Sequence, residues 1–149
     1  MSPRDWLLIL CAYHGAPSGL DPVRVQKSMF LFARSGAVPP AEQYAFRPYD
    51  YGPMSAGIYN DLDVLVSQRL LEPHPVFGKS WSRYTVTERG RSVAGERLMK
   101  MTQDRDKENA RRLYEIKQEI ASVSFSELLE RVYREHPDMA VNSVFRQAD

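Results

Sequence analysis

The order of the periodic segments constrains the fold of this chain more than any single motif does. Three amphipathic helical patterns come first, each with apolar residues spaced three and four positions apart. Two β-capable stretches follow at 70–76 and 81–87, joined by the turn-like sequence Phe77-Gly78-Lys79-Ser80. Helical patterns then fill the remainder of the chain. This order predicts an α+β fold in which packed helices are completed by one antiparallel hairpin.

The starts of the first two helices are marked by a polar capping residue followed by proline. Ser2-Pro3 precedes the first helical pattern and Asp21-Pro22 the second, and we expect the second helix to end at Ser35-Gly36. The third pattern carries Ile58, Leu62, Leu65 and Val66 on one face. It follows the sequence Tyr51-Gly52-Pro53, with Ser55 close behind. We expect Gly52 to adopt a backbone conformation that other residues avoid, and Pro53 to open the first turn of the third helix.

Three helices followed by a hairpin are typical of a winged helix-turn-helix, in which the helix before the hairpin is offered to DNA and the hairpin is the wing. The pattern predicts a winged-helix domain over 1–101 and a C-terminal helical extension over 102–149. A generic α+β domain with the same order of elements is the alternative. The extension carries apolar residues spaced 3, 4 and 3 apart at Leu113, Ile116, Ile120 and Val123. They predict either packing back onto the same chain or the seam of a homodimer.

The composition is that of an ordinary globular protein. The 149 residues are 43% hydrophobic and 26% charged, and the formal net charge is only +1, so any basic surface must be local. No apolar run approaches the roughly 18 residues that a membrane-spanning helix needs. One cysteine, Cys11, excludes a disulfide within the chain. We expect a cytoplasmic protein with no membrane partner.

The spacing of reactive residue types does not favour catalysis. Gly78-Lys79-Ser80 is similar to the end of a phosphate-binding loop, but Pro73 stands where that loop requires glycine. Cys11 and His14 can supply only half of a metal site, because the other histidines have no ligand-spaced neighbours. The sequence therefore predicts no enzymatic activity, no metal and no cofactor.

Basic residues are concentrated in the hairpin region, although the whole chain is nearly neutral. Between 69 and 91 they oppose only Glu72 and Glu88, which gives this segment a net charge of +3. The basic residues are Arg69, Lys79, Arg83, Arg89 and Arg91. Clusters of this kind bind phosphates, and a solvated hairpin is the alternative. We predict DNA contact through Arg69, Lys79 and Arg83.

The outer face of the third helix is compatible with either DNA or a protein as its binding partner. A rotation of about 100° per residue places Asn60, Asp63 and Ser67 outward with Ala56 and Val64. Asn60 and Ser67 can read base edges, whereas Asp63 repels phosphates and no Lys or Arg accompanies it. For a protein partner, the contact candidates are Tyr59, Asn60 and Asp63.

The aromatic residues around this helix permit a second interpretation. Tyrosines stand at positions 44, 49, 51 and 59, and with Phe30 they could form a stacking platform. Packing in the core is the favoured interpretation, because buried positions commonly hold aromatic side chains. Phe30 lies off the apolar stripe of its helix and is the exception to test.

Four segments of the chain, 25–32, 51–65, 84–90 and 127–137, carry a resemblance to a known family, and the most specific motif in them is Tyr-Gly-Pro-x-Ser at 51–55. These segments resemble the Panacea family, the SocA-like, antitoxin-associated domains, together with the related YwgA-like small bacterial proteins. The resemblance implies a bacterial or phage source, no catalysis, and a role as an antitoxin, protein adaptor or regulator.

The combined interpretation is a non-catalytic winged-helix protein that binds DNA and regulates transcription. The alternative is an antitoxin or adaptor of a toxin–antitoxin-like system that acts through contact with a toxin or another protein.

Overall fold

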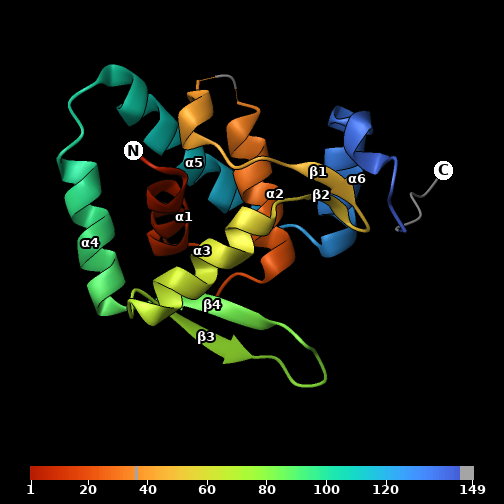
Figure 1. The fold of residues 1–149 in the computed structure, drawn as a ribbon, viewed down its shortest axis with the longest axis horizontal. Coiled ribbons are helices and arrows are strands. Elements are labelled where there is room, and N and C mark those ends of the chain that lie inside the picture. The colour runs from red at the N-terminus through yellow and green to blue at the C-terminus, as the bar shows by residue number, and fades with distance from the viewer. Residues whose placement is uncertain (36, 145–149) are drawn as a thin grey trace.

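The computed structural model describes residues 1–35 and 37–144, and these form six α-helices and two small antiparallel sheets (Figure 1). The elements are α1 Pro3–Ala12, α2 Pro22–Ala33, β1 Arg47–Tyr49, β2 Gly52–Met54, α3 Ala56–Ser67, β3 Leu71–Pro75, β4 Ser82–Val86, α4 Glu88–Met99, α5 Asp104–Ala121 and α6 Phe125–Glu135, with 3-10 turns at Pro40–Glu42 and Pro137–Ala140. The predicted α+β class is confirmed. In the described residues, no helix is both long and apolar enough to cross a bilayer.

The predicted helix starts are confirmed by their caps. The Ser2 hydroxyl accepts a hydrogen bond from the Asp5 backbone N–H (3.1 Å), and the Asp5 carboxylate accepts one from the Ser2 N–H. Asp21 caps α2 in the same way, by accepting from the Arg24 N–H (2.9 Å). Each cap satisfies N–H groups that have no partner within the helix. Of the predicted end of the second helix, Ser35 lies just beyond α2, and Gly36 lies outside the described residues.

Helix α2 lies at the centre of the molecule and is buried on nearly every side (Figure 1). Even its polar residues Gln26 and Lys27 are only 2% and 3% exposed. The Gln26 side chain donates to the Ser55 carbonyl (2.9 Å) and accepts from the Ser55 N–H (2.8 Å). The Lys27 ammonium donates to the Pro53 carbonyl (3.0 Å). Polar groups of α2 therefore determine where α3 begins.

The Tyr51-Gly52-Pro53 turn occupies a different place from the one predicted. Gly52 does adopt a positive φ of 87°, as expected. However, the turn joins β1 to β2, and Pro53 lies in β2 opposite Pro48 instead of opening the third helix. Ser55 occupies the N-cap position of α3, and Ala56 is its first residue. The prediction for Pro53 is wrong because the chain makes one more short strand before the helix starts.

The second hairpin, formed by β3 and β4, has the predicted position. Leu71 pairs with Val86 at its base and Pro75 with Ser82 near its tip. Tyr84 of β4 also pairs with Leu20, which lies between α1 and α2, through two backbone hydrogen bonds of 3.0 and 2.9 Å. Strand β4 is therefore held between β3 and the segment that leads into α2.

The apolar stripe of α5 faces the core of its own chain. Leu113, Ile116 and Ile120 are fully buried, and α5 packs mainly on α2. The predicted dimer seam through these side chains is wrong, because they have no surface left for a second copy. Val123 lies beyond the end of α5. One cluster of buried side chains joins residues on both sides of the predicted boundary at 101–102, so the described residues share one core.

Candidate functional site

A cavity of about 710 Å³ opens between the start of α2, the β1–β2 turn, α3 and the tip of the β3–β4 hairpin. We call it the hairpin groove. Its aromatic residues are Tyr51, Tyr59, Trp81 and Phe125, and its basic residues are Arg24, Lys79 and Arg83. Tyr51 and Phe125 meet edge to face, with ring centroids 5.7 Å apart. The groove thus combines flat apolar surfaces with positive charge.

The three basic residues of the groove differ in what they already bind. Arg24 is engaged, because its guanidinium donates to the Asp21 carboxylate (2.7 Å) and to the Val123 carbonyl (2.7 Å). For Lys79 and Arg83, the described part of the chain offers no carboxylate within 4.0 Å. These two cations remain available to an external anion.

Cations with and without a carboxylate partner also lie in different parts of the molecule. The cations of α5 at Arg105, Arg111 and Arg112 all pair with carboxylates. None of the five predicted basic residues between 69 and 91 has an ion pair with another described residue. A cation that already faces a carboxylate gains less from a phosphate, so all five cations of the hairpin region remain available to one.

The tip of the β3–β4 hairpin projects from the body of the molecule (Figure 1). Phe77 at this tip is fully exposed, with a relative exposure of 103%. The turn closes through a hydrogen bond from the Lys79 N–H to the Val76 carbonyl (3.0 Å), and Gly78 has a φ of 76°. A large apolar ring is thereby held in solvent next to a free cation.

The outer face of α3 is exposed as predicted, but it contributes little to the groove. Asn60, Asp63 and Ser67 all lie on the exposed side, opposite the buried Leu62. The Ser67 hydroxyl already donates to the Val64 carbonyl (2.7 Å) within its own helix. Of the described α3 residues, only Tyr59 lines the groove.

Asp63 acts on the hairpin through its charge. Burial raises the pKa of Tyr84, and the Asp63 carboxylate adds to this rise. An exposed carboxylate beside the hairpin weakens the attraction of this region for phosphates.

The expectation that the tyrosines pack in the core is wrong for three of them. Tyr49, Tyr51 and Tyr59 are 44–46% exposed, because they lie on the β1–β2 turn and on the outer side of α3. Tyr44 is half-buried, and its hydroxyl donates to the Asp61 carboxylate (2.6 Å). Phe30 is buried, where it packs edge to face against Phe46 and His136.

The structure brings together four of the predicted site residues and separates others from them. Tyr51, Tyr59, Lys79 and Arg83 line one groove. Ser67 and Arg69 lie at the opposite end of α3, and Arg69 has a φ of 60° in the turn that leads to β3. Asn60 is exposed on α3, next in sequence to the groove residue Tyr59.

Among the aromatic and basic residues of the groove, three were missed by the sequence analysis. Trp81 follows the hairpin turn directly, and an aromatic residue beside a basic tip was a usable signal. Arg24 and Phe125 carry no such signal, because each stands in the first turn of a helix with an ordinary amphipathic pattern. Only the packing of α2 beside α6 places them at the groove.

Neither a metal-binding cluster in the described residues nor a known relative identifies the function of this site. Among residues 1–35 and 37–144, no three His, Cys, Asp or Glu side chains are placed to hold a metal ion. No protein-family model matches the chain, and a search of the curated proteins finds no match either. The similarity to the Panacea family stays a prediction that depends on the four quoted segments.

Proposed function

We propose that this chain is a non-catalytic regulator that binds DNA as a winged-helix protein, with the β3–β4 hairpin as its wing. The proposal depends on one observation. Two cations without a carboxylate partner among the described residues, Lys79 and Arg83, lie on a projecting hairpin whose tip exposes Phe77. Cations of this kind release counterions from DNA when they neutralise phosphates, which is the main source of non-specific affinity.

The winged-helix assignment is supported by the pairing of Leu20 with Tyr84. This pairing adds an extended residue from between the first two helices to the edge of the hairpin, and α3 directly precedes that hairpin. The connection from α2 to α3 departs from the usual turn of three or four residues, because residues 34–55 include the β1–β2 hairpin. The contacts of Gln26 and Lys27 with this connection hold α3 in place without a short turn.

The proposed contacts divide between the hairpin and α3. Lys79 and Arg83 bind phosphates, and Phe77 wedges against the minor groove as apolar side chains do in many architectural proteins. Helix α3 has no Lys or Arg, so base contacts are limited to groups such as Asn60 and Tyr59. We expect an affinity that depends strongly on salt and weakly on sequence.

The test measures the salt dependence of binding to a fluorescent DNA duplex by anisotropy. The double variant Lys79→Ala/Arg83→Ala should lower the salt slope by about two units, since each lost phosphate contact removes about one. The double variant Lys100→Ala/Lys107→Ala is the matched control. It removes the same charge from two exposed lysines without ion pairs in the described chain, and it should preserve the slope. No binding by the wild type at low salt, or equal slopes in the two doubles, would refute the DNA proposal.

A role as an antitoxin or protein adaptor is the second candidate, and the exposed tyrosines favour it. Tyr51 and Tyr59 present aromatic surface in the same groove as Trp81 and Arg83, and Tyr49 is exposed as well. Tyr, Trp and Arg dominate the energetics of protein interfaces. In this case Tyr51→Ala/Tyr59→Ala should abolish co-purification with the product of an adjacent gene, while Lys79→Ala/Arg83→Ala should weaken it less. The opposite ranking would exclude an interface centred on the tyrosines.

A further inference from the structure

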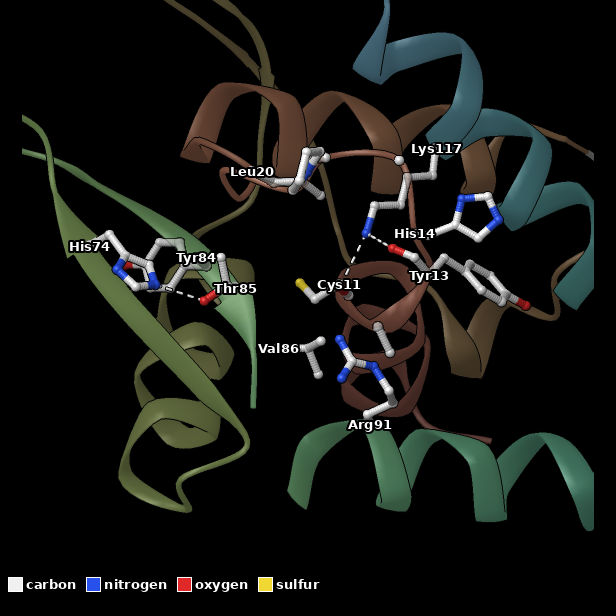
Figure 2. A pocket seen from close by; sticks show the side chains of 14 residues that line it. Cys11, Tyr13, His14, Leu20, His74, Tyr84, Thr85, Val86, Arg91 and Lys117 are labelled. Carbon is white, nitrogen blue, oxygen red and sulfur yellow. Dashed lines mark hydrogen bonds between the residues drawn. The ribbon is translucent and has the colours of Figure 1, made fainter. Parts of the chain in front are cut away.

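A second cavity, of about 560 Å³, lies on the other side of the Leu20–Tyr84 pairing (Figure 2). Its walls come from the end of α1 and the following loop, from β4, and from α4 and α5. Figure 2 shows the Lys117 ammonium directed at the end of α1, with Arg91 extending from α4 on the opposite side. This cavity is distinct from the hairpin groove.

The charges that line this cavity are of one sign. Of the described residues that line it, the two that are charged, Arg91 and Lys117, are both cationic, and none is Asp or Glu. The neutral part of the wall includes Leu20, Tyr84 and Val86. The cavity therefore offers cationic groups on two facing walls, with apolar surface beside them.

Lys117 is an unusual cation because it is buried without a carboxylate. It is only 2% exposed, and it donates to the backbone carbonyls of Cys11 (3.1 Å) and Tyr13. An ammonium has three N–H donors, so one donor is left. Within the described chain no carboxylate lies within 4.0 Å of its nitrogen.

The surroundings of Lys117 offset its charge only in part. The two carbonyls lie at the C-terminal end of α1, where the helix dipole is negative. Burial nevertheless lowers the pKa of Lys117 to about 8. Burial also raises the pKa of the Cys11 thiol to about 11, so this neighbour is neutral at physiological pH. An anion in the cavity would supply the missing counter-charge.

Arg91 is the second cation of this cavity and lies across it from Lys117. It is exposed on α4 and, among the described residues, no carboxylate is within 4.0 Å of its guanidinium. A planar guanidinium and a single ammonium donor together match the two oxygens of a carboxylate. The two histidines make polar contacts of their own, His74 with the Thr85 hydroxyl (2.7 Å) and His14 with the Tyr114 hydroxyl (3.0 Å).

We propose that this cavity binds a small organic carboxylate with an apolar ring or chain. The carboxylate lies between Lys117 and Arg91, and the apolar body packs against Leu20, Tyr84 and Val86. The volume is within the range of about 300–1,000 Å³ that small-molecule sites have. The proposal is independent of DNA binding.

The experiment titrates the full-length protein with salicylate and follows backbone amide shifts by NMR. Saturable binding is expected, with the largest shifts around β4 and the α1–α2 loop, and salicylamide should not bind because it lacks the charge. Arg91→Ala should weaken salicylate binding about tenfold, the effect of one charge-assisted hydrogen bond. Arg89→Ala is the matched control, since Arg89 is exposed on the same helix and does not line the cavity.

Several results would overturn the proposal. They are an absence of saturable salicylate binding, equal binding of salicylamide, or equal affinities of the Arg91→Ala and Arg89→Ala variants. Tight binding of phenyl phosphate with none of salicylate would refute the carboxylate assignment. Lys117→Met tests the buried cation where the variant retains a cooperative unfolding transition, and it should then lose salicylate binding. If Lys117 serves only as a cap on the end of α1, the wild type should show no saturable binding of salicylate.

Discussion

The two hydrogen bonds between Gln26 and Ser55 should contribute more to stability than any other single polar contact of α2. Gln26→Met removes both bonds with little change in volume. It leaves the N–H of buried Ser55 without a partner, while the Ser55 carbonyl keeps the hydrogen bond from the Ile58 N–H (3.2 Å). Each orphaned buried group costs about 1–3 kcal/mol, and the added apolar burial offsets part of this. We expect the free energy of unfolding to fall by about 2 kcal/mol.

Urea unfolding followed by circular dichroism measures this loss. For a slope of about 2 kcal/mol per molar urea, the midpoint should fall by about 1 M. Gln68→Met is the control, because Gln68 is exposed at the end of α3 and its substitution should change stability by less than about 0.5 kcal/mol. If Gln26→Met were as stable as Gln68→Met, α2 would not hold the start of α3 through this side chain.

Three further predictions concern the turn, the buried lysines and α3. Gly52→Ala should lower the free energy of unfolding by about 1–2 kcal/mol, because an alanine at a φ of 87° is strained; an unchanged thermal midpoint would contradict this. Burial lowers the pKa of Lys27 and Lys117 from 10.5 to about 8, so between these values the unfolded state binds more protons and stability rises with pH. Each lysine should add about 1 kcal/mol between pH 7 and 9 in urea unfolding, and Lys27→Met should lose its share of the rise. If the DNA proposal holds, Asp63→Asn should tighten duplex binding several-fold in the anisotropy assay, whereas Asp104→Asn on α5 should not.

Local rules decided much of the secondary structure of this protein. The caps at Ser2 and Asp21 act within three residues of their own position, so they could be predicted without knowledge of the fold. The β3–β4 hairpin was equally predictable, because its turn and its two strands lie close together in the sequence. Periodicity also identified the buried side of α3, with Leu62 inside and Asn60 outside.

Tertiary structure decided which helix faces are buried and which distant residues lie together. The same 3.6-residue periodicity marks a helix face that packs in the core and one that forms a dimer, so the sequence could not assign Ile116 to either. The residues around Lys117 in the sequence do not predict its contact with the end of α1. Only the packing of α5 brings its ammonium to the Cys11 carbonyl. Tyr59 and Arg83 meet in one groove for the same reason. Propensities and caps depend on neighbours within about four residues, whereas the two cavities depend on segments brought together from across the whole chain.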